Sequence, residues 1–556
     1  MEKIWLQEYP EGVPAEIDVN EFPSLREFLE QSFSKYRSLP AFTNMGHSIS
    51  FGELDEMSRY LGGWLQKNAG LSKGDCVAVM MPNVIQYAVA VAAILRAGLT
   101  VTNVNPLYTP RELEHQLNDS GAKAIIMVEN FAATLQKVRH NTPLKTVVVT
   151  GIGDMLPVPK RHLVNFVIRK VKKMVPAWDI PDAVPFHKAL KEGKWQTMDT
   201  PPLGHDDIAF LQYTGGTTGV AKGAMLTHRN IIANLLQARA WLSVTVVEGQ
   251  STVVTPLPLY HIFSLTANFF VFTLMGGNNI LITNPRDLPA FVKELNKHKF
   301  TFMTGVNTLF NGLLNTPGFE DVDFSHLRVT LGGGMAVQAA VAERWKQVTG
   351  KPLIQAYGLT ETSPAASINP LTQKEFNGSI GVPISSTEFS IRDEDGNELG
   401  IGAVGEICIR GPQVMAGYWK RPDETEKVML EGGWFRSGDM GRMDDRGYIY
   451  IEDRKKDMIL VSGFNVYPNE VEGVAVTHPA VLEAAAVGIP DEKSGEMVKL
   501  FVVCREGQSV TEKELIDFCR ESLTGYKVPR KVEFRQELPK TNVGKILRRA
   551  LRDGGS

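Results

Sequence analysis

The sequence is poor in the features of a disulfide scaffold, a zinc site or a membrane-spanning chain. Its 556 residues include only four cysteines, with no CxxC spacing and no paired histidine cluster. This pattern is typical of reduced thiols in the cytosol. No window of about 18 consecutive apolar residues occurs, and the first residues lack the apolar core of a secretion signal. We therefore expect a cytoplasmic protein without a transmembrane helix.

The chain also has little net charge, because acidic and basic residues nearly balance. The formal net charge is −3, which argues against a nucleic-acid partner bound through bulk charge. Hydrophobic residues make up 43% of the chain, an ordinary value for a globular protein. The length exceeds what one compact core accommodates, so the sequence predicts two or more domains.

The densest functional signal is the segment 213–223, Tyr-Thr-Gly-Gly-Thr-Thr-Gly-Val-Ala-Lys-Gly. Such a loop can bring backbone N–H groups, hydroxyls and one ammonium onto a polyphosphate. The apolar run 208–212 predicts a buried strand before it, and residues 224–241 predict a helix after it. The segment is not a Walker A loop, because Lys222 precedes Gly223 where that motif requires Ser or Thr. A flexible surface loop is the alternative interpretation.

The remaining pattern predicts an α/β fold. Strand and helix signals alternate over residues 40–150 and 250–360, which favours parallel sheets covered by helices. After residue 380, short strands and turns predict a β-rich subdomain. The charged run 452–457 reads as a solvated face or linker, and about 100 residues with their own α+β pattern follow. We expect an N-terminal domain over 1–452 and a C-terminal domain over 455–556.

Five further segments carry chemistry: 357–364, 434–441, 453–463, 463–470 and 539–549. Together with the glycine loop, and in this order, they closely resemble the acyl-adenylate-forming (ANL) superfamily over essentially the whole chain. The stretches 210–214, 258–263 and 462–469 resemble its bacterial long-chain fatty acid–CoA ligases. The resemblance implies ATP-dependent conversion of a fatty acid to acyl-AMP, transfer of the acyl group to CoA, and a need for Mg²⁺.

The resemblance also implies roles for individual residues. The expected catalytic groups are Lys545, Glu361 and Lys222. Glu361, assisted by Thr214, is the expected Mg²⁺ ligand, because a hard cation prefers oxygen. In isolation, Glu361 would read as a turn cap and Lys545 as a solvated lysine in a basic tail. The expected ATP- and AMP-binding residues are Tyr213, Thr214, Gly215, Gly216, Thr217, Thr218, Gly219, Gly333, Tyr357, Gly358, Thr360, Asp439 and Arg454.

Residues for the acid and the thiol follow from the same resemblance. Asp453 is the expected hinge, with Arg454 beside it, about which a mobile C-terminal domain would rotate. The CoA channel is expected at Ser462, Gly463 and Asn465. The acyl pocket is expected at Tyr260, His261, Phe263, Gly332 and Gly334, with His261 shaping the pocket rather than acting as a base.

The acid itself is expected to be apolar. Residues 263–274 are strongly apolar and suit an alkyl chain. No carboxylate occurs over 257–283 to pair an amino acid's ammonium, which disfavours an amino acid substrate. Two alternatives stay open: a fatty acyl-AMP ligase that loads a carrier protein, and an inactive acyl-binding protein.

A basic amphipathic stretch spans residues 159–178. Lysines and arginines alternate there with apolar residues, and no acidic residue lies between Asp154 and Asp179. Such a stretch can lie on an anionic membrane surface, here the inner face of the cell membrane. An ordinary solvated surface helix is the equal alternative. The family resemblance also favours a homodimer.

Overall fold

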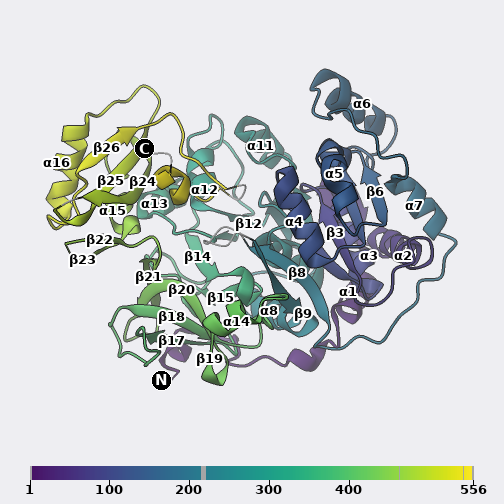
Figure 1. The fold of residues 1–556 in the computed structure, drawn as a ribbon, viewed down its shortest axis with the longest axis horizontal. Helices are drawn as coiled ribbons and strands as arrows, with labels where there is room; N and C mark the ends of the chain where they lie inside the picture. The colour runs from purple at the N-terminus through teal and green to yellow at the C-terminus, as the bar shows by residue number, and fades with distance from the viewer. Residues whose placement is uncertain (1–2, 215–220, 463, 492, 542–543, 554–556) are drawn as a thin grey trace.

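The computed structural model describes residues 3–214, 221–462, 464–491, 493–541 and 544–553. Figure 1 shows an α/β architecture in which two large sheets build the N-terminal body, an antiparallel sheet follows, and a further sheet forms a C-terminal body. The predicted α/β class, with a β-rich subdomain and a C-terminal α+β domain, is confirmed.

The first large sheet has the order β7-β6-β5-β3-β4-β8-β9, and its strands are parallel except for the β8–β9 pair. Both of its faces are covered, and its strands β3 (Cys76–Met80) and β5 (Ala124–Val128) are accordingly apolar and buried throughout. Its strands are β3 (Cys76–Met80), β4 (Thr100–Asn103), β5 (Ala124–Val128), β6 (Thr146–Thr150), β7 (Val184–Pro185), β8 (Ile208–Thr214) and β9 (Lys222–Thr227).

Helices cover this sheet because strand residues alternate between two apolar layers. Val77 and Val79 of β3 pack in the layer that contains α2 and α3, whereas Ala78 and Met80 pack in the layer of α4 and α5. Reciprocal capping boxes begin α2 and α4. The helices around this sheet are α1 (Leu25–Lys35), α2 (Phe51–Lys67), α3 (Ile85–Arg96), α4 (Pro110–Ser120), α5 (Ala132–Val138), α6 (Lys160–Phe166) and α7 (Phe186–Gly193).

The second large sheet has the order β16-β15-β14-β13-β12-β10-β11-β1-β2, parallel from β14 to β1. Its strands are β1 (Pro40–Asn44), β2 (His47–Ser50), β10 (Thr252–Thr255), β11 (Asn278–Leu281), β12 (Phe302–Gly305), β13 (Val329–Gly332), β14 (Leu353–Gly358), β15 (Ala365–Ile368) and β16 (Val382–Pro383). The helices that follow its strands are α9 (Ile262–Ser264), α10 (Val271–Leu274), α11 (Leu288–Leu295), α12 (Asn307–Leu314) and α13 (Ala339–Thr349), whereas α8 (His228–Leu242) follows β9 of the first sheet.

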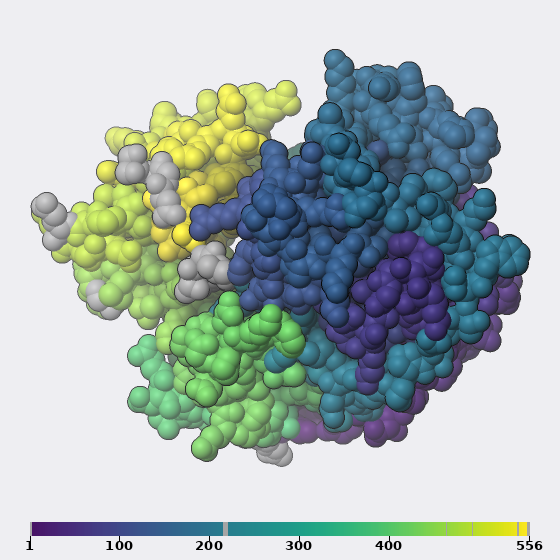
Figure 2. Space-filling view, turned by 45° about the vertical axis from the view of Figure 1, so that its right-hand side comes forward, coloured from purple at the N-terminus to yellow at the C-terminus, as the bar shows by residue number. Residues whose placement is uncertain are grey.

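The last two sheets carry the remaining elements. The antiparallel sheet contains β17 (Glu388–Arg392), β18 (Gly405–Arg410), β19 (Met429–Leu430), β20 (Trp434–Met443) and β21 (Ile449–Arg454), with α14 (Pro422–Val428) beside it. The C-terminal body has its own apolar core and forms a separate lobe in Figure 2. It contains β22 (Ile459–Val461), β23 (Phe464–Val466), β24 (Val481–Asp491), β25 (Gly495–Cys504), β26 (Lys531–Phe534), α15 (Pro468–Ala475), α16 (Glu512–Ser522) and α17 (Arg548–Asp553).

One local prediction is wrong. The helix expected from residue 224 begins at His228, and the residues before it form β9, which pairs antiparallel with β8 from Thr214↔Lys222 onward. Thr227 explains the boundary, because its side chain accepts a hydrogen bond from the Asn230 N–H and caps the helix there. The glycine loop therefore joins two strands of a hairpin, and no helix N-terminus follows it directly.

No helix in the described ranges is both long and apolar enough to cross a membrane. All four cysteines lie in these ranges and are free.

The contact between α2 and α7 generates a stability prediction. A Cβ added at Gly193 would lie 2.0 Å from the backbone oxygen of Tyr60. Gly193→Ala should therefore separate the two helices and destabilise the protein by about 1–3 kcal/mol, the usual cost of overpacking. The measurement is the apparent melting temperature. Gly204→Ala is the matched control, because nothing lies within 4 Å of its added Cβ; equal melting temperatures for the two variants would contradict the prediction.

Candidate active site at the junction of the two bodies

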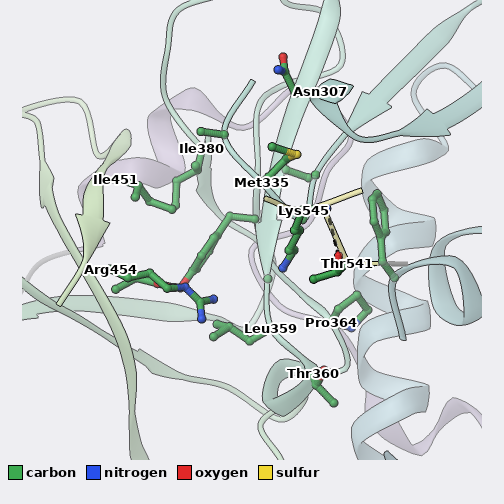
Figure 3. Close-up of a pocket in the computed structure, with 18 of the residues that line it drawn as sticks. Asn307, Met335, Leu359, Thr360, Pro364, Ile380, Ile451, Arg454, Thr541 and Lys545 are labelled. Carbon is green, nitrogen blue, oxygen red and sulfur yellow. Dashed lines mark hydrogen bonds and ion pairs between the residues drawn. The ribbon is translucent and has the colours of Figure 1, made fainter. Parts of the chain in front are cut away.

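A cavity of about 1850 Å³ lies where the N-terminal body, the antiparallel sheet and the C-terminal segment 540–552 meet. Figure 3 shows Lys545 and Arg454 reaching into this cavity from different chain segments. The structure brings sixteen predicted residues together in its wall. They are Tyr213, Thr214, Lys222, Tyr260, His261, Phe263, Gly333, Gly334, Tyr357, Gly358, Thr360, Glu361, Asp439, Asp453, Arg454 and Lys545.

Other predicted residues lie elsewhere. Gly332 ends β13 outside the cavity wall, where an added Cβ would meet Leu353 and Val337, so close packing explains this glycine. Ser462 and Asn465 are exposed on the β22–β23 hairpin and do not line the cavity. The remaining predictions fall outside the described residues: Gly215, Gly216, Thr217, Thr218, Gly219 and Gly463.

Asp439 is the centre of a buried polar group on β20. Tyr357 donates its hydroxyl to Asp439 Oδ2 at 2.6 Å, and Arg454 Nε lies 3.0 Å from Asp439 Oδ1. A bulge in β20 explains why this carboxylate faces the cavity: the register with β18 shifts at this point, and Gly438 adopts φ 74°. Burial raises the pKa of Tyr357 well above its ordinary value, and the Asp439 charge adds to this effect. The tyrosine therefore stays a neutral donor.

Glu361 is held by a residue that the sequence did not point to. Tyr418 donates its hydroxyl to Glu361 Oε1 at 2.7 Å, and its ring lies 4.7 Å from the Lys222 ammonium. Lys222 in turn pairs with Glu424 at 2.6 Å. Glu361 is 9% exposed. Its carboxylate is thus fixed in the cavity wall by a neutral donor rather than by a cation.

Glu361 and Thr214 suit Mg²⁺ in its usual mode of binding. Among the described residues no cluster of three or more His, Cys, Asp or Glu could hold a metal by itself. Mg²⁺ is commonly bound by one or two carboxylates together with waters and substrate phosphates. One carboxylate and one hydroxyl in the same cavity wall therefore fit a cation that arrives with a polyphosphate.

Lys545 lies on a short bridged loop of the C-terminal body. Lys540 and Ile546 form a β-bridge at its base, and the Lys545 N–H donates to Thr541 Oγ1 at 3.0 Å. Burial, together with the nearby Arg454 charge, lowers the pKa of Lys545 to about 8, against the opposing effect of Asp439 and Glu361. The ammonium is consequently a desolvated charge inside the cavity.

Asp453 is the exception to the solvated face or linker expected over residues 452–457, in which Lys455 and Lys456 are exposed. Its carboxylate is fully buried and accepts hydrogen bonds from the backbone N–H groups of Arg454 at 2.7 Å and Asn469 at 2.8 Å. Arg548 lies 3.4 Å from it and also binds Glu472. Burial raises the pKa of Asp453 to about 6, with Arg548 opposing the rise. The predicted hinge is thus tied by its side chain to α15 and α17.

The other end of the cavity is apolar. Besides Phe263 and Gly333, the cavity is lined there by side chains of α8, α10 and the second large sheet. They are Ala238, Trp241, Leu242, Val271, Phe302 and Leu331. Burial lowers the pKa of His261 to about 3, and the charge of Lys545 adds to this effect. His261 is therefore neutral, and its Nδ1 accepts from the Phe263 N–H at 3.4 Å. One cavity joins a polar, charged end to an apolar end.

The chain is similar to known proteins over nearly its whole length. The family model described as "AMP-binding enzyme" matches residues 29–419, and the model for its C-terminal domain matches residues 470–545. The chain belongs to the AMP-binding enzyme family. Within this family, it is 56% identical over 553 residues to the long-chain-fatty-acid–CoA ligase of Escherichia coli O157:H7, covering 100% of this chain and 98% of that relative. The ligase of the same description from Bacillus subtilis strain 168 is 39% identical, with 99% and 98% covered.

Solved structures of this family agree with the fold. ATP-bound MatB from Rhodopseudomonas palustris is 27% identical, with a TM-score of 0.79 and coverage of 95% of this chain and 98% of that one. The Mycobacterium tuberculosis fatty acyl CoA synthetase is 26% identical, with a TM-score of 0.68 over 96% and 98%.

The geometry generates a prediction for Lys545. It should titrate near pH 8 in the ligand-free protein rather than near its ordinary 10.5. Because the folded-state pKa is lowered, the cost of burying the charged amine is present in full below pH 8 and is relieved as the pH rises toward 10.5. Carbon-13 NMR of reductively methylated protein measures this titration, and Lys545→Ala identifies the signal by its loss. A Lys545 signal that titrates only above pH 10 would contradict the burial described here.

Proposed function

We propose that this protein is an ATP-dependent long-chain fatty acid–CoA ligase that forms acyl-AMP and pyrophosphate and then transfers the acyl group to CoA. The observation that carries the proposal is the single cavity with two different ends. Its polar end contains Lys545, Glu361, Asp439 and Arg454, and its apolar end is lined by α8 and α10. The full-length similarity to ligases of this description supports it.

In the first step, a carboxylate oxygen of the acid would attack the α-phosphorus of ATP, and pyrophosphate would leave. Two anions must approach each other, so cationic groups are needed where the charge gathers. We assign this role to Lys545, with Lys222 and the loop 214–219 on the β- and γ-phosphates. Asp439 and Arg454 would hold the ribose. Mg²⁺, bound by Glu361 with help from Thr214, would neutralise phosphate charge.

In the second step, the CoA thiol would attack the acyl carbonyl and release AMP. Ser462 and Asn465, which we assign to the CoA channel with Gly463, are exposed outside the cavity. A rotation of residues 455–556 about Asp453 and Arg454 would carry them to the acyl-AMP and withdraw Lys545. A few backbone angles at one hinge suffice for such a movement.

The test of this function measures AMP release by purified protein with ATP, Mg²⁺ and CoA, across saturated acids from acetate to stearate. We expect CoA-dependent turnover that is greatest with long chains, because the apolar end of the cavity stabilises an alkyl chain by burial. Acyl-AMP without CoA-dependent turnover would indicate a carrier-protein acceptor. Absence of acyl-AMP would contradict the enzyme assignment and leave an acyl-binding protein.

Lys545→Ala separates the two steps in the same assay. Loss of a preorganised charge at the reacting atoms should slow adenylation by about 100-fold or more. Thioester formation from supplied acyl-AMP should change little. Lys513→Ala, at an exposed position of α16, is the control. Equal losses in both steps would contradict the role of Lys545.

We also propose that the stretch 159–178 contacts a membrane surface. In support, α6 and the π-helical turn Val167–Val171 that follows it expose apolar side chains to solvent. Leu163 is 63% exposed, Phe166 57% and Val171 65%. Lys170, Lys172 and Lys173 are exposed beside them. Figure 1 places α6 at the periphery of the molecule. Exposed apolar and cationic groups side by side suit an anionic lipid surface, such as the inner face of the cell membrane.

Replacing Lys170, Lys172 and Lys173 together by Glu should abolish co-sedimentation with vesicles that contain anionic lipid. The same reversal at Lys293, Lys297 and Lys299, which are exposed near α11, is the matched control and should leave sedimentation unchanged. Equal sedimentation of both triple variants would identify 159–178 as an ordinary surface. The homodimer implied by the family resemblance stays a prediction.

A further inference from the structure

One face of α12 contacts the C-terminal body at three points. Thr308, Asn311 and Asn315 follow each other at spacings of three and four residues, so they lie on the same side of the helix and its C-terminal cap. Thr308 Oγ1 donates to the Gly544 carbonyl at 3.0 Å, and Asn311 Nδ2 donates to the Leu482 carbonyl at 3.2 Å. Arg505 Nη1 donates to Asn315 Oδ1 at 3.3 Å. Figure 1 shows α12 beside β24.

The opposite side of α12 is anchored in the N-terminal body. Phe310 and Leu313 are fully buried, and the Phe310 ring lies 4.7 Å from that of Trp345 of α13. Arg344 of α13 also donates to Asn315 Oδ1 at 2.9 Å. The three contacting side chains therefore project from a helix that packing holds in place, and they can define a position for the body they touch.

Thr308 acts closest to the chemistry, because Gly544 directly precedes Lys545. Gly544 adopts φ 82°, and an added Cβ would lie 2.7 Å from Thr308 Oγ1. The backbone thus approaches the hydroxyl too closely for a side chain to intervene. The N–H of the same peptide unit, which is that of Lys545, donates to Thr541 Oγ1. The lysine is consequently held by a hydroxyl from each body.

We propose that this face of α12 is the docking surface that selects the adenylating arrangement of the C-terminal domain, and that Thr308 is a positioning residue for Lys545. The inference rests on the proposed two-step function. When the C-terminal domain rotates for thioester formation, these three hydrogen bonds would be released together. The face therefore stabilises one of the two arrangements and leaves the chemistry of the other unaffected.

Thr308→Val tests the positioning role, since it keeps the shape of the side chain and removes the donor. Adenylation should fall about two- to tenfold, the range that corresponds to one hydrogen bond. Thioester formation from supplied acyl-AMP should stay at the wild-type rate. Thr308→Ser retains the hydroxyl and should recover most of the adenylation. Thr316→Val is the matched control, because the Thr316 hydroxyl donates to Gly312 within the N-terminal body.

Asn315→Ala, Arg505→Ala and the double variant test the docking surface away from the cavity. If the two residues act through their mutual contact, the second substitution should have no further effect. The double variant should then lose no more adenylation than the less active of the two single variants. Equal losses in both half-reactions, additive losses, or full adenylation by Thr308→Val would overturn the inference. If the wild-type protein forms acyl-AMP, these results would contradict only the docking surface and leave the proposed function unaffected. If the wild-type protein forms no acyl-AMP, the proposed function itself is contradicted.

Discussion

The structure depends on holding one desolvated ammonium group at a junction between two bodies. Lys545 belongs to the C-terminal body, yet the groups that offset its charge, Asp439 and Glu361, belong to the N-terminal body. Either body alone would bury this charge without a partner, and burying an unpaired charge raises the free energy of the folded state. The site therefore exists only while the two bodies are docked, and the side chains around it serve that docking.

Two sets of contacts enforce this arrangement from opposite ends of the lysine loop. At the proposed hinge, the buried carboxylate of Asp453 faces Arg548, three residues beyond Lys545. At the other end, Thr308 of α12 fixes the peptide that precedes the lysine. An enzyme that alternates between two reactions needs such contacts to be polar and few. Hydrogen bonds of this kind contribute modestly and can be exchanged, whereas a large apolar interface would hold one state permanently.

The predicted site residues lie in distinctive motifs, whereas other residues of the cavity wall do not. Asp439, Glu361 and Lys545 were predicted, and the structure gathers them in one cavity, although their roles stay predictions. Tyr418, Thr308 and Arg548 carried no separate signal, because their partners are 57, 236 and 95 residues away in the chain. The start of α8 was misplaced for a related reason: the residues of high helix propensity at 224–226 pair with β8 instead, and tertiary pairing overrode local preference.

The sequence by itself determined the α/β class and the family, because these follow from apolar periodicity and from motifs that are contiguous in the chain. Only the tertiary structure decided that the glycine loop lies in a hairpin, that Asp453 is buried rather than solvated, and that Lys545 loses its water inside the cavity. The physical reason is the same in each case. Burial, desolvation and the ionisation they control depend on groups from distant segments, and no local pattern encodes which of them will meet.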